Sequence, residues 1–205
     1  MKWLLLFIGM ILSAYEVNIV KVNGDTVYFD KYVKRGVSGL VLCPYENQNI
    51  ICACVISDGK KGYLRVYDSL KNNAFVLPYV LPKKNDKVLL AKDYNRILII
   101  APNQTEYIKV LQKYQNQTVI HPDNFAVFLD EYPTRSDFVN FAKKMNIGRY
   151  IFVLDKIYEV DAKSLYVLKS YGKNEYKYNA PFFTTYNLSN TLQNPIAYYK
   201  NLIRN

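Results

Sequence analysis

The N-terminal half of the chain has the apolar pattern of short strands separated by turns. The runs YEVNIVKV and TVYFDK flank Asn23-Gly24, and Asn-Gly between two strand-like runs is a strong hairpin signal. Further strand-like runs follow, punctuated by glycine and proline, in the order KRGVSGLVLCPY, NIICACVISD, GYLRVYD and KVLLAKD. About six strands without a convincing helix predict a small β-barrel or compact sandwich, here called the barrel module.

From Tyr94 onwards the spacing of apolar residues is that of strands alternating with helices. Strand-like RILIIAP precedes helical TEYIKVLQKY, and TVIHP precedes two helical runs, DNFAVFLDEY and SDFVNFAKKM. The segment from Arg149 to Gly172 predicts two or three strands in a meander, and Asn194-Pro195 predicts the start of a C-terminal helix. This order predicts an α/β module whose helices pack on a mixed sheet.

The predicted fold is therefore mixed, α+β or α/β, with a barrel-like module at residues 15–93 packed on an α/β module at residues 94–205. Residues 1–14, MKWLLLFIGMILSA, place one lysine before an apolar run that ends in small residues, which predicts a cleaved secretory signal peptide. The run is shorter than the roughly 20 apolar residues of a membrane span, and an uncleaved anchor is the alternative. We expect a periplasmic protein, with the cell surface as the alternative location.

The three cysteines lie close together, at Cys43, Cys52 and Cys54. If Glu46–Asn49 forms a hairpin loop, Cys43 faces Cys52 across two strands at a distance that a disulfide can bridge. The spacing lacks the four ligands of a structural zinc site and contains no C-x-x-C pair. Three alternatives stay open: buried free thiols, a disulfide between Cys43 and Cys52, or metal or redox chemistry.

Composition and motifs argue against catalysis. A hydrophobic content of 50% indicates a packed core, and the net charge of +10 is spread along the chain, which does not favour nucleic-acid binding. His121 is the only histidine; we interpret it as a turn residue bonded to backbone, with a catalytic base as the alternative. The sequence has no nucleophile elbow, P-loop or H-E-x-x-H motif. We expect no enzyme activity, cofactor, metal or small-molecule substrate.

The corner IIAPNQTEY leads from a strand into a helix, where α/β proteins often bind anions. Here Asn103 and Thr105 can themselves cap the free N–H groups, and Glu106 places a negative charge in the first turn. No glycine allows a phosphate to approach the backbone. The pattern therefore predicts a self-capped structural corner instead of a ligand site.

Several stretches of the chain resemble one known family. RILIIAPNQTEYIKV, the motifs APNQ, HPD-F and PT-x-x-DF, and VNGDTVYFDKYVKRGVSGLV are similar to the N-terminal domain of plasminogen-binding surface proteins of epsilon-class Gram-negative bacteria. The resemblance covers roughly residues 16–170. It implies an exported envelope protein that binds other proteins and has no known catalysis. The members named for plasminogen binding carry a lysine-bearing tail, whereas this sequence ends Lys200-Asn-Leu-Ile-Arg204-Asn205.

Two functions follow from this resemblance. The first is a non-catalytic scaffold that binds other envelope proteins in a large assembly, such as the periplasmic part of the flagellar motor. The alternative is a surface factor that binds plasminogen, a host protein. Because tyrosine and arginine are favoured at interfaces, the predicted interface residues are Tyr171, Tyr176, Tyr178, Tyr198, Tyr199 and Arg204. In the alternative interpretation, Ile196, Tyr199 and Ile203 simply dock the last helix onto the sheet.

Overall fold

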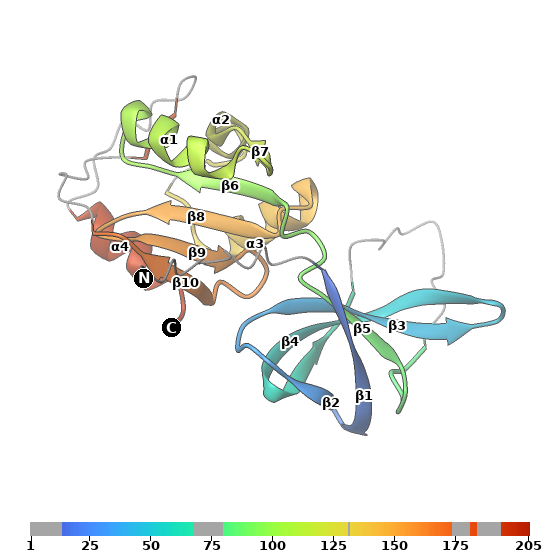
Figure 1. Ribbon diagram of the computed structural model, residues 1–205. Coiled ribbons are helices and arrows are strands. Elements are labelled where there is room, and N and C mark those ends of the chain that lie inside the picture. Colours follow the sequence, from blue (N-terminus) through green and yellow to red (C-terminus); the bar gives the residue numbers. More distant parts are fainter. Residues whose placement is uncertain (1–13, 68–79, 131, 174–180, 184–193) are drawn as a thin grey trace, which may run out of the picture.

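The computed structural model describes residues 14–67, 80–130, 132–173, 181–183 and 194–205 (Figure 1). Within them, two five-stranded sheets and four α-helices form the two parts of the chain, which confirms the predicted mixed fold class. Apart from Ala14, the predicted signal peptide lies outside the described residues, as do the predicted interface residues Tyr176 and Tyr178.

The barrel module is a closed barrel of antiparallel strands. Hydrogen-bonded neighbours follow the order β1-β2-β4-β3-β5, and β5 pairs in turn with β1. The strands are β1 (Tyr15–Asn23), β2 (Thr26–Val33), β3 (Ser38–Tyr45), β4 (Gln48–Arg65) and β5 (Lys87–Leu90). Because the barrel is closed, each strand has a hydrogen-bonded neighbour on both sides. The sheet therefore has no open edge that could pair with another chain.

The barrel begins with the predicted hairpin. Asn23 pairs with Thr26, and Gly24 between them has a φ of +55°, a conformation that glycine adopts without strain. Alternate residues of β1 and β2 point inward and are buried, and Phe29 belongs to this core. A Cβ at Gly62 of β4 would lie 2.4 Å from Cζ of Phe29, so the close packing of strand against ring requires glycine there.

Strand β4 corrects one prediction, because NIICACVISD and the beginning of GYLRVYD, as far as Arg65, form one strand instead of two. Up to Ile56 the strand pairs with β3, and from Gly59 it pairs with β2. Gly59 has a φ of +69°, which lets the strand bend between its two partners without ending. The glycines of this segment therefore curve the barrel wall and do not form a turn.

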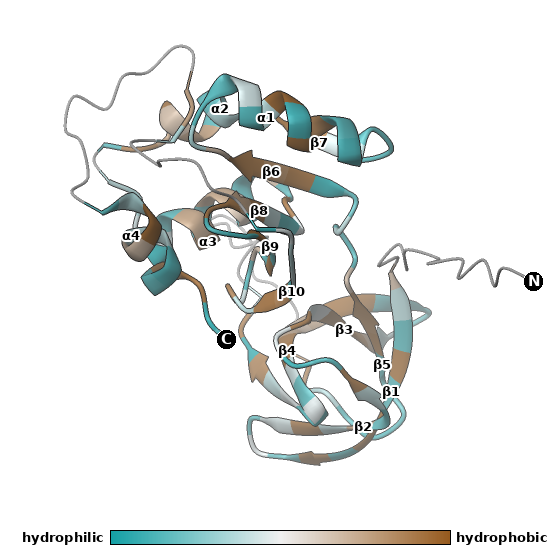
Figure 2. Cartoon of the chain, turned by 60° about the vertical axis from the view of Figure 1, so that its left-hand side comes forward, coloured by the Kyte–Doolittle hydropathy of each residue, from teal (hydrophilic) through white to brown (hydrophobic). Residues whose placement is uncertain are grey.

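The α/β module is built on a mixed sheet of order β10-β9-β8-β6-β7. Strand β6 runs parallel to β7 and β8, whereas β9 and β10 continue the sheet in antiparallel fashion. The strands are β6 (Arg96–Ile100), β7 (Thr118–Ile120), β8 (Arg149–Val153), β9 (Ile157–Asp161) and β10 (Val167–Tyr171). The central strands β6 and β8 are covered on both faces, which explains their nearly continuous apolar runs; β6 is brown in Figure 2.

Helices cover both faces of this sheet (Figure 1). They are α1 (Gln104–Leu111), followed by a short 3-10 turn η1 (Gln112–Tyr114), α2 (Pro122–Ala126), α3 (Arg135–Met145) and α4 (Pro195–Leu202). Helix α1 packs on one face through Tyr107 and Val110. The helices α2, α3 and α4 pack on the other face, and their core residues are mostly aromatic: Phe125, Phe138, Phe141 and Tyr199.

The helix starts follow from capping residues in the sequence. Asn103 Oδ1 accepts a hydrogen bond from the N–H of Glu106 at 2.9 Å, and Asn194 caps α4 in the same way. Thr134 and Asp137 form a reciprocal capping box at α3. The predicted helix DNFAVFLDEY is wrong in length, because α2 ends at Ala126. After Ala126 the backbone hydrogen bonds change from the α-helical spacing to the tighter i→i+3 spacing, and the side chain of Leu129 points into the core.

Cys43 and Cys52 form a disulfide between β3 and β4. The strands deviate from the simple hairpin register, since Cys43 pairs with Ile50 and a bulge accommodates Cys52. The bulge brings the two Cα atoms to 5.8 Å, within the usual range for a bridge. Of the three alternatives for the cysteines, the structure has the disulfide, and the partly buried Cys54 is not part of it.

Reduction of this disulfide should destabilise the barrel module. The bridge closes a loop with a sequence separation of 9 residues, and the chain-entropy model assigns such a loop about 2–3 kcal/mol. Urea unfolding with and without a thiol reductant measures the loss. A double Cys43→Ala/Cys52→Ala variant should lose stability in both conditions equally, while Cys54→Ala should keep the full response to reductant. An unchanged midpoint on reduction of the wild-type protein would contradict the bridge.

Candidate protein-binding cleft between the two modules

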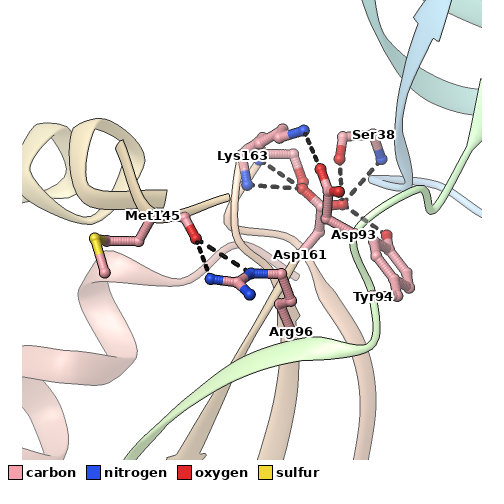
Figure 3. Close-up of polar contacts among 8 residues, drawn as sticks. Ser38, Asp93, Tyr94, Arg96, Met145, Asp161 and Lys163 are labelled. Atoms are coloured by element: carbon pink, nitrogen blue, oxygen red, sulfur yellow. Dashed lines mark hydrogen bonds and ion pairs between the residues drawn. The ribbon is translucent and has the colours of Figure 1, made fainter. Parts of the chain in front are cut away.

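The carboxylate of Asp161 joins the two modules at their junction (Figure 3). Oδ2 accepts hydrogen bonds from the N–H and the hydroxyl of Ser38 in β3, at 2.9 and 2.7 Å, and from the hydroxyl of Tyr94 at 2.6 Å. Oδ1 accepts from the N–H groups of Lys163 and Ser164 at 3.0 and 2.8 Å. Asp161 is fully buried, so these five donors replace the water that an exposed carboxylate would bind.

Further contacts strengthen the same junction. The hydroxyl of Ser164 donates to the carbonyl of Gly36 at 2.6 Å, and Lys34 donates to the carbonyl of Leu168. A Cβ at Gly36 would lie 2.1 Å from Cβ of Tyr166, and its φ is +84°, so this approach of the two modules requires glycine. The side chain of Leu168 in β10 packs in the barrel core, which makes the modules share one apolar cluster.

A second buried network lies on the sheet beside the junction. Nη1 of Arg149 and Oε2 of Glu159 are 2.6 Å apart, and both side chains are less than one tenth exposed. Nε of Arg149 donates to the carbonyl of Tyr94 at 2.9 Å, and the hydroxyl of Tyr114 donates to Glu159 at 3.1 Å. The ion pair therefore has additional hydrogen-bond partners on both sides, as a buried pair needs. It holds the segment that connects β5 to β6 against the sheet.

A cleft of about 560 Å³ opens between the modules next to this junction. Its walls come from β3 and β4 of the barrel, from α3, and from the turn between β9 and β10. Ser38 and Ser164, which are bonded to Asp161, also line it, so the Asp161 network fixes the position of the walls. The volume falls within the range of roughly 300–1,000 Å³ that is common for ligand sites.

The cleft has a strongly positive lining. Among the described residues it contains one carboxylate, that of Asp93, which lies 3.4 Å from Nζ of Lys163. The cationic residues that line it are Arg65, Lys92, Arg135, Lys143, Lys163 and Arg204. Positive charges gathered in a cleft with apolar walls concentrate the electrostatic field and attract anionic groups. No motif in the sequence indicates this site, because its residues are scattered between positions 38 and 204.

The predicted interface residues fall in different places. Arg204 lies in the cleft, with its guanidinium 5.8 Å from the ring centre of Tyr166. Tyr198 is partly exposed and donates to the carbonyl of Pro133, and the hydroxyl of half-buried Tyr171 lies 2.7 Å from that of Tyr114. The prediction for Tyr199 is corrected, because its ring is 1% exposed and packs in the core; it docks α4 onto the sheet.

His121 acts as the N-cap of α2. Its Nδ1 accepts a hydrogen bond from the N–H of Asp123 at 3.3 Å, and its ring packs edge-on against Tyr107. Both contacts are those of a helix-entry residue. Within the described ranges, no three His, Cys, Asp or Glu side chains gather where they could hold a metal ion.

The family model described as plasminogen-binding protein pgbA N-terminal matches residues 14–200. The chain belongs to this family. The match runs from the start of β1 into α4 and includes both modules, the junction and nearly all of the cleft lining. No curated protein and no solved structure matched the chain. Among the described residues of this family member, no helix has the length and apolar character that crossing a membrane requires.

Replacing Asp161 by asparagine should destabilise this family member strongly. The amide nitrogen cannot accept the hydrogen bonds that now reach one carboxylate oxygen, so buried donors lose their partner. Hydrogen bonds to a charged group are worth about 1.5–3 kcal/mol each, and we expect a loss of roughly 3–5 kcal/mol in the free energy of unfolding. Asp155→Asn is the matched control, because its carboxylate is 38% exposed and its pair with Lys200 contributes at most about 1 kcal/mol. Equal urea midpoints for the two variants would contradict the role of Asp161.

Buried tyrosines should make the protein unstable in alkali. Burial, and then the charge of Asp161, raise the pKa of Tyr94 well above its ordinary value, while burial followed by the charge of Glu159 raises the pKa of Tyr114. Burial likewise raises the pKa of Tyr150. In the unfolded chain these groups ionise near pH 10, as exposed tyrosines do.

The buried tyrosines therefore contribute fully to the free energy of unfolding below about pH 10. As the pH rises further this contribution is lost, at up to about 1.4 kcal/mol per pH unit for each tyrosine. Urea unfolding between neutral pH and about pH 11 measures this slope. Tyr94→Phe should reduce the slope, and Tyr32→Phe, at a ring that is 74% exposed, should leave it unchanged. A free energy of unfolding independent of pH above 10 would contradict the expectation.

Proposed function

We propose that this protein is a non-catalytic binding protein whose partner is another protein, with host plasminogen as the leading candidate. The observation that carries the proposal is the family match over residues 14–200. It supports binding to plasminogen better than the predicted role in an envelope scaffold or the flagellar motor, which stays a prediction. Export to the cell envelope belongs to the same proposal, with the cell surface as the location that plasminogen binding requires.

The architecture is consistent with a binding role. Buried hydrogen bonds and a shared apolar cluster hold the barrel module and the α/β module together, so their surfaces keep a fixed relative position. A surface that is already ordered loses little conformational entropy when it binds a partner. The cleft and the exposed cations around it give this surface a charge that can steer association.

Lysine provides a specific test of plasminogen as the partner. Kringle modules bind the cation of an exposed lysine, and this chain displays exposed lysines on its surface, including two that contact a carboxylate. Nζ of Lys200 lies 2.7 Å from a carboxylate oxygen of Asp155, and Nζ of Lys87 lies 3.1 Å from one of Glu16. The side chains of both pairs are between about one third and somewhat more than one half exposed.

Plasminogen should bind the immobilised protein saturably, and 6-aminohexanoic acid should displace it, because this compound carries the cation and the carboxylate of a lysine ligand. Biolayer interferometry with plasminogen in solution measures the interaction, and serum albumin serves as the control protein. Absence of saturable binding, or binding that is indifferent to 6-aminohexanoic acid, would overturn lysine-dependent plasminogen binding. Protease treatment of intact cells adds a second criterion: a protein wholly shielded there cannot meet a host protein and would favour the scaffold prediction.

A further inference from the structure

Both modules build the cleft, and its floor is rigid. Ser38 of β3 and Ser164 of the β9–β10 turn line it while they are hydrogen-bonded to Asp161 below. Helix α3 presents Arg135 and Lys143 to the opening, together with Val139 between them. A side chain that enters the cleft would therefore meet apolar walls and cations at fixed positions.

Two of the arginines that line the cleft are in contact with uncharged groups. Arg135 donates from Nε to the carbonyl of Leu202 at 2.9 Å and from Nη2 to the carbonyl of Asn201, at the end of α4. The guanidinium of Arg204 lies over the ring of Tyr166. Within the described part of the chain, neither arginine has a carboxylate partner. Their planar guanidinium groups match the geometry of a carboxylate and can pair with one.

The rest of the lining favours a peptide over nucleic acid. Binding of single strands relies on aromatic side chains on which bases stack, and among the described lining residues only Tyr67 is aromatic. The apolar side chains Ile56, Val66 and Val139 are partly or largely exposed and can instead contact the aliphatic parts of a polypeptide. Arginine is also enriched at protein interfaces, where lysine is depleted.

We infer that the cleft is the binding site for an acidic segment of a partner protein, whose Asp or Glu carboxylates pair with Arg135 and Arg204. Arg65, Lys92 and Lys143 surround this contact and increase the local concentration of the acidic segment. The inference rests on the proposed function only in that the partner is a protein. It does not require plasminogen, whose lysine-dependent binding would use other surfaces.

A short acidic peptide tests the inference directly. The probe is a fluorescein-labelled octapeptide of alternating glutamate and glycine, and the reference is the same peptide with glutamine in place of glutamate. Fluorescence anisotropy should show saturable binding of the glutamate peptide that weakens as ionic strength rises. The glutamine peptide should bind at least about tenfold more weakly, because it cannot form the charge-assisted hydrogen bonds.

Charge-matched variants separate the cleft from the general positive charge of the protein. The triple variant Arg65→Gln/Lys92→Gln/Arg204→Gln removes three exposed cations of the cleft, and we expect at least about a tenfold loss of affinity for the glutamate peptide. The control Lys21→Gln/Lys61→Gln/Lys84→Gln removes three exposed cations of the barrel that do not line it, and it should change affinity by less than about twofold. Circular dichroism and urea midpoints verify that both variants remain folded.

Several results would overturn the inference. The first is that the wild-type protein binds the two peptides equally. The second is that the two triple variants lose the same affinity for the glutamate peptide. The third is that the protein binds a sulfated polysaccharide but does not bind the glutamate peptide. The first comparison uses only the wild-type protein and so does not depend on the folding of a variant. Plasminogen binding, measured on the same three proteins, is a separate result. If the peptide binds in the cleft and plasminogen does not bind, the proposed partner is wrong and the cleft assignment stands.

Discussion

The desolvated carboxylate of Asp161 is the interaction on which the arrangement of the two modules depends. A charge without solvent is tolerated only where hydrogen-bond donors surround it, and here they come from β3, from the segment before β6 and from the turn that contains Asp161 itself. Each donor must remain within hydrogen-bond distance, so the network fixes the barrel on the sheet. The packing of Leu168 in the barrel core and the close approach at Gly36 are compatible only with that placement.

The same constraint explains why the cleft exists as a site. If a flexible linker joined the two modules, the width of the gap between them would vary. Here Ser38 and Ser164, which line the cleft, form hydrogen bonds across the junction of the two modules, so its width is fixed. Arg135 donates to a backbone carbonyl and Arg204 lies over an aromatic ring, and both of these contacts are with uncharged groups. Such a site can recognise charge without undergoing a conformational change.

Much of the fold could be predicted because its signals are local. Asn23-Gly24, the capping residues Asn103, Thr134 and Asn194, and the apolar stripes of the helices act within a few residues of themselves. The errors have a common origin in tertiary contacts. The continuity of β4 depends on having β3 and β2 as successive partners, and the end of α2 depends on the burial of Leu129. The sequence left two interpretations of Tyr199 open, because apolar spacing does not distinguish a core tyrosine from one at an interface; the structure buries it in the core.

By itself the sequence determined the types of element, the order of the two modules and the family. The turn from Asp161 to Ser164 is likewise a local feature. A turn is specified locally, because an aspartate side chain reaches the N–H groups two and three residues ahead. Only the tertiary structure decided that the other oxygen of the same carboxylate meets Ser38, which lies 123 positions away, and that scattered cations line one cleft. Contacts over such separations leave no periodic or spacing signal in a single sequence, because they depend on how the finished modules pack together.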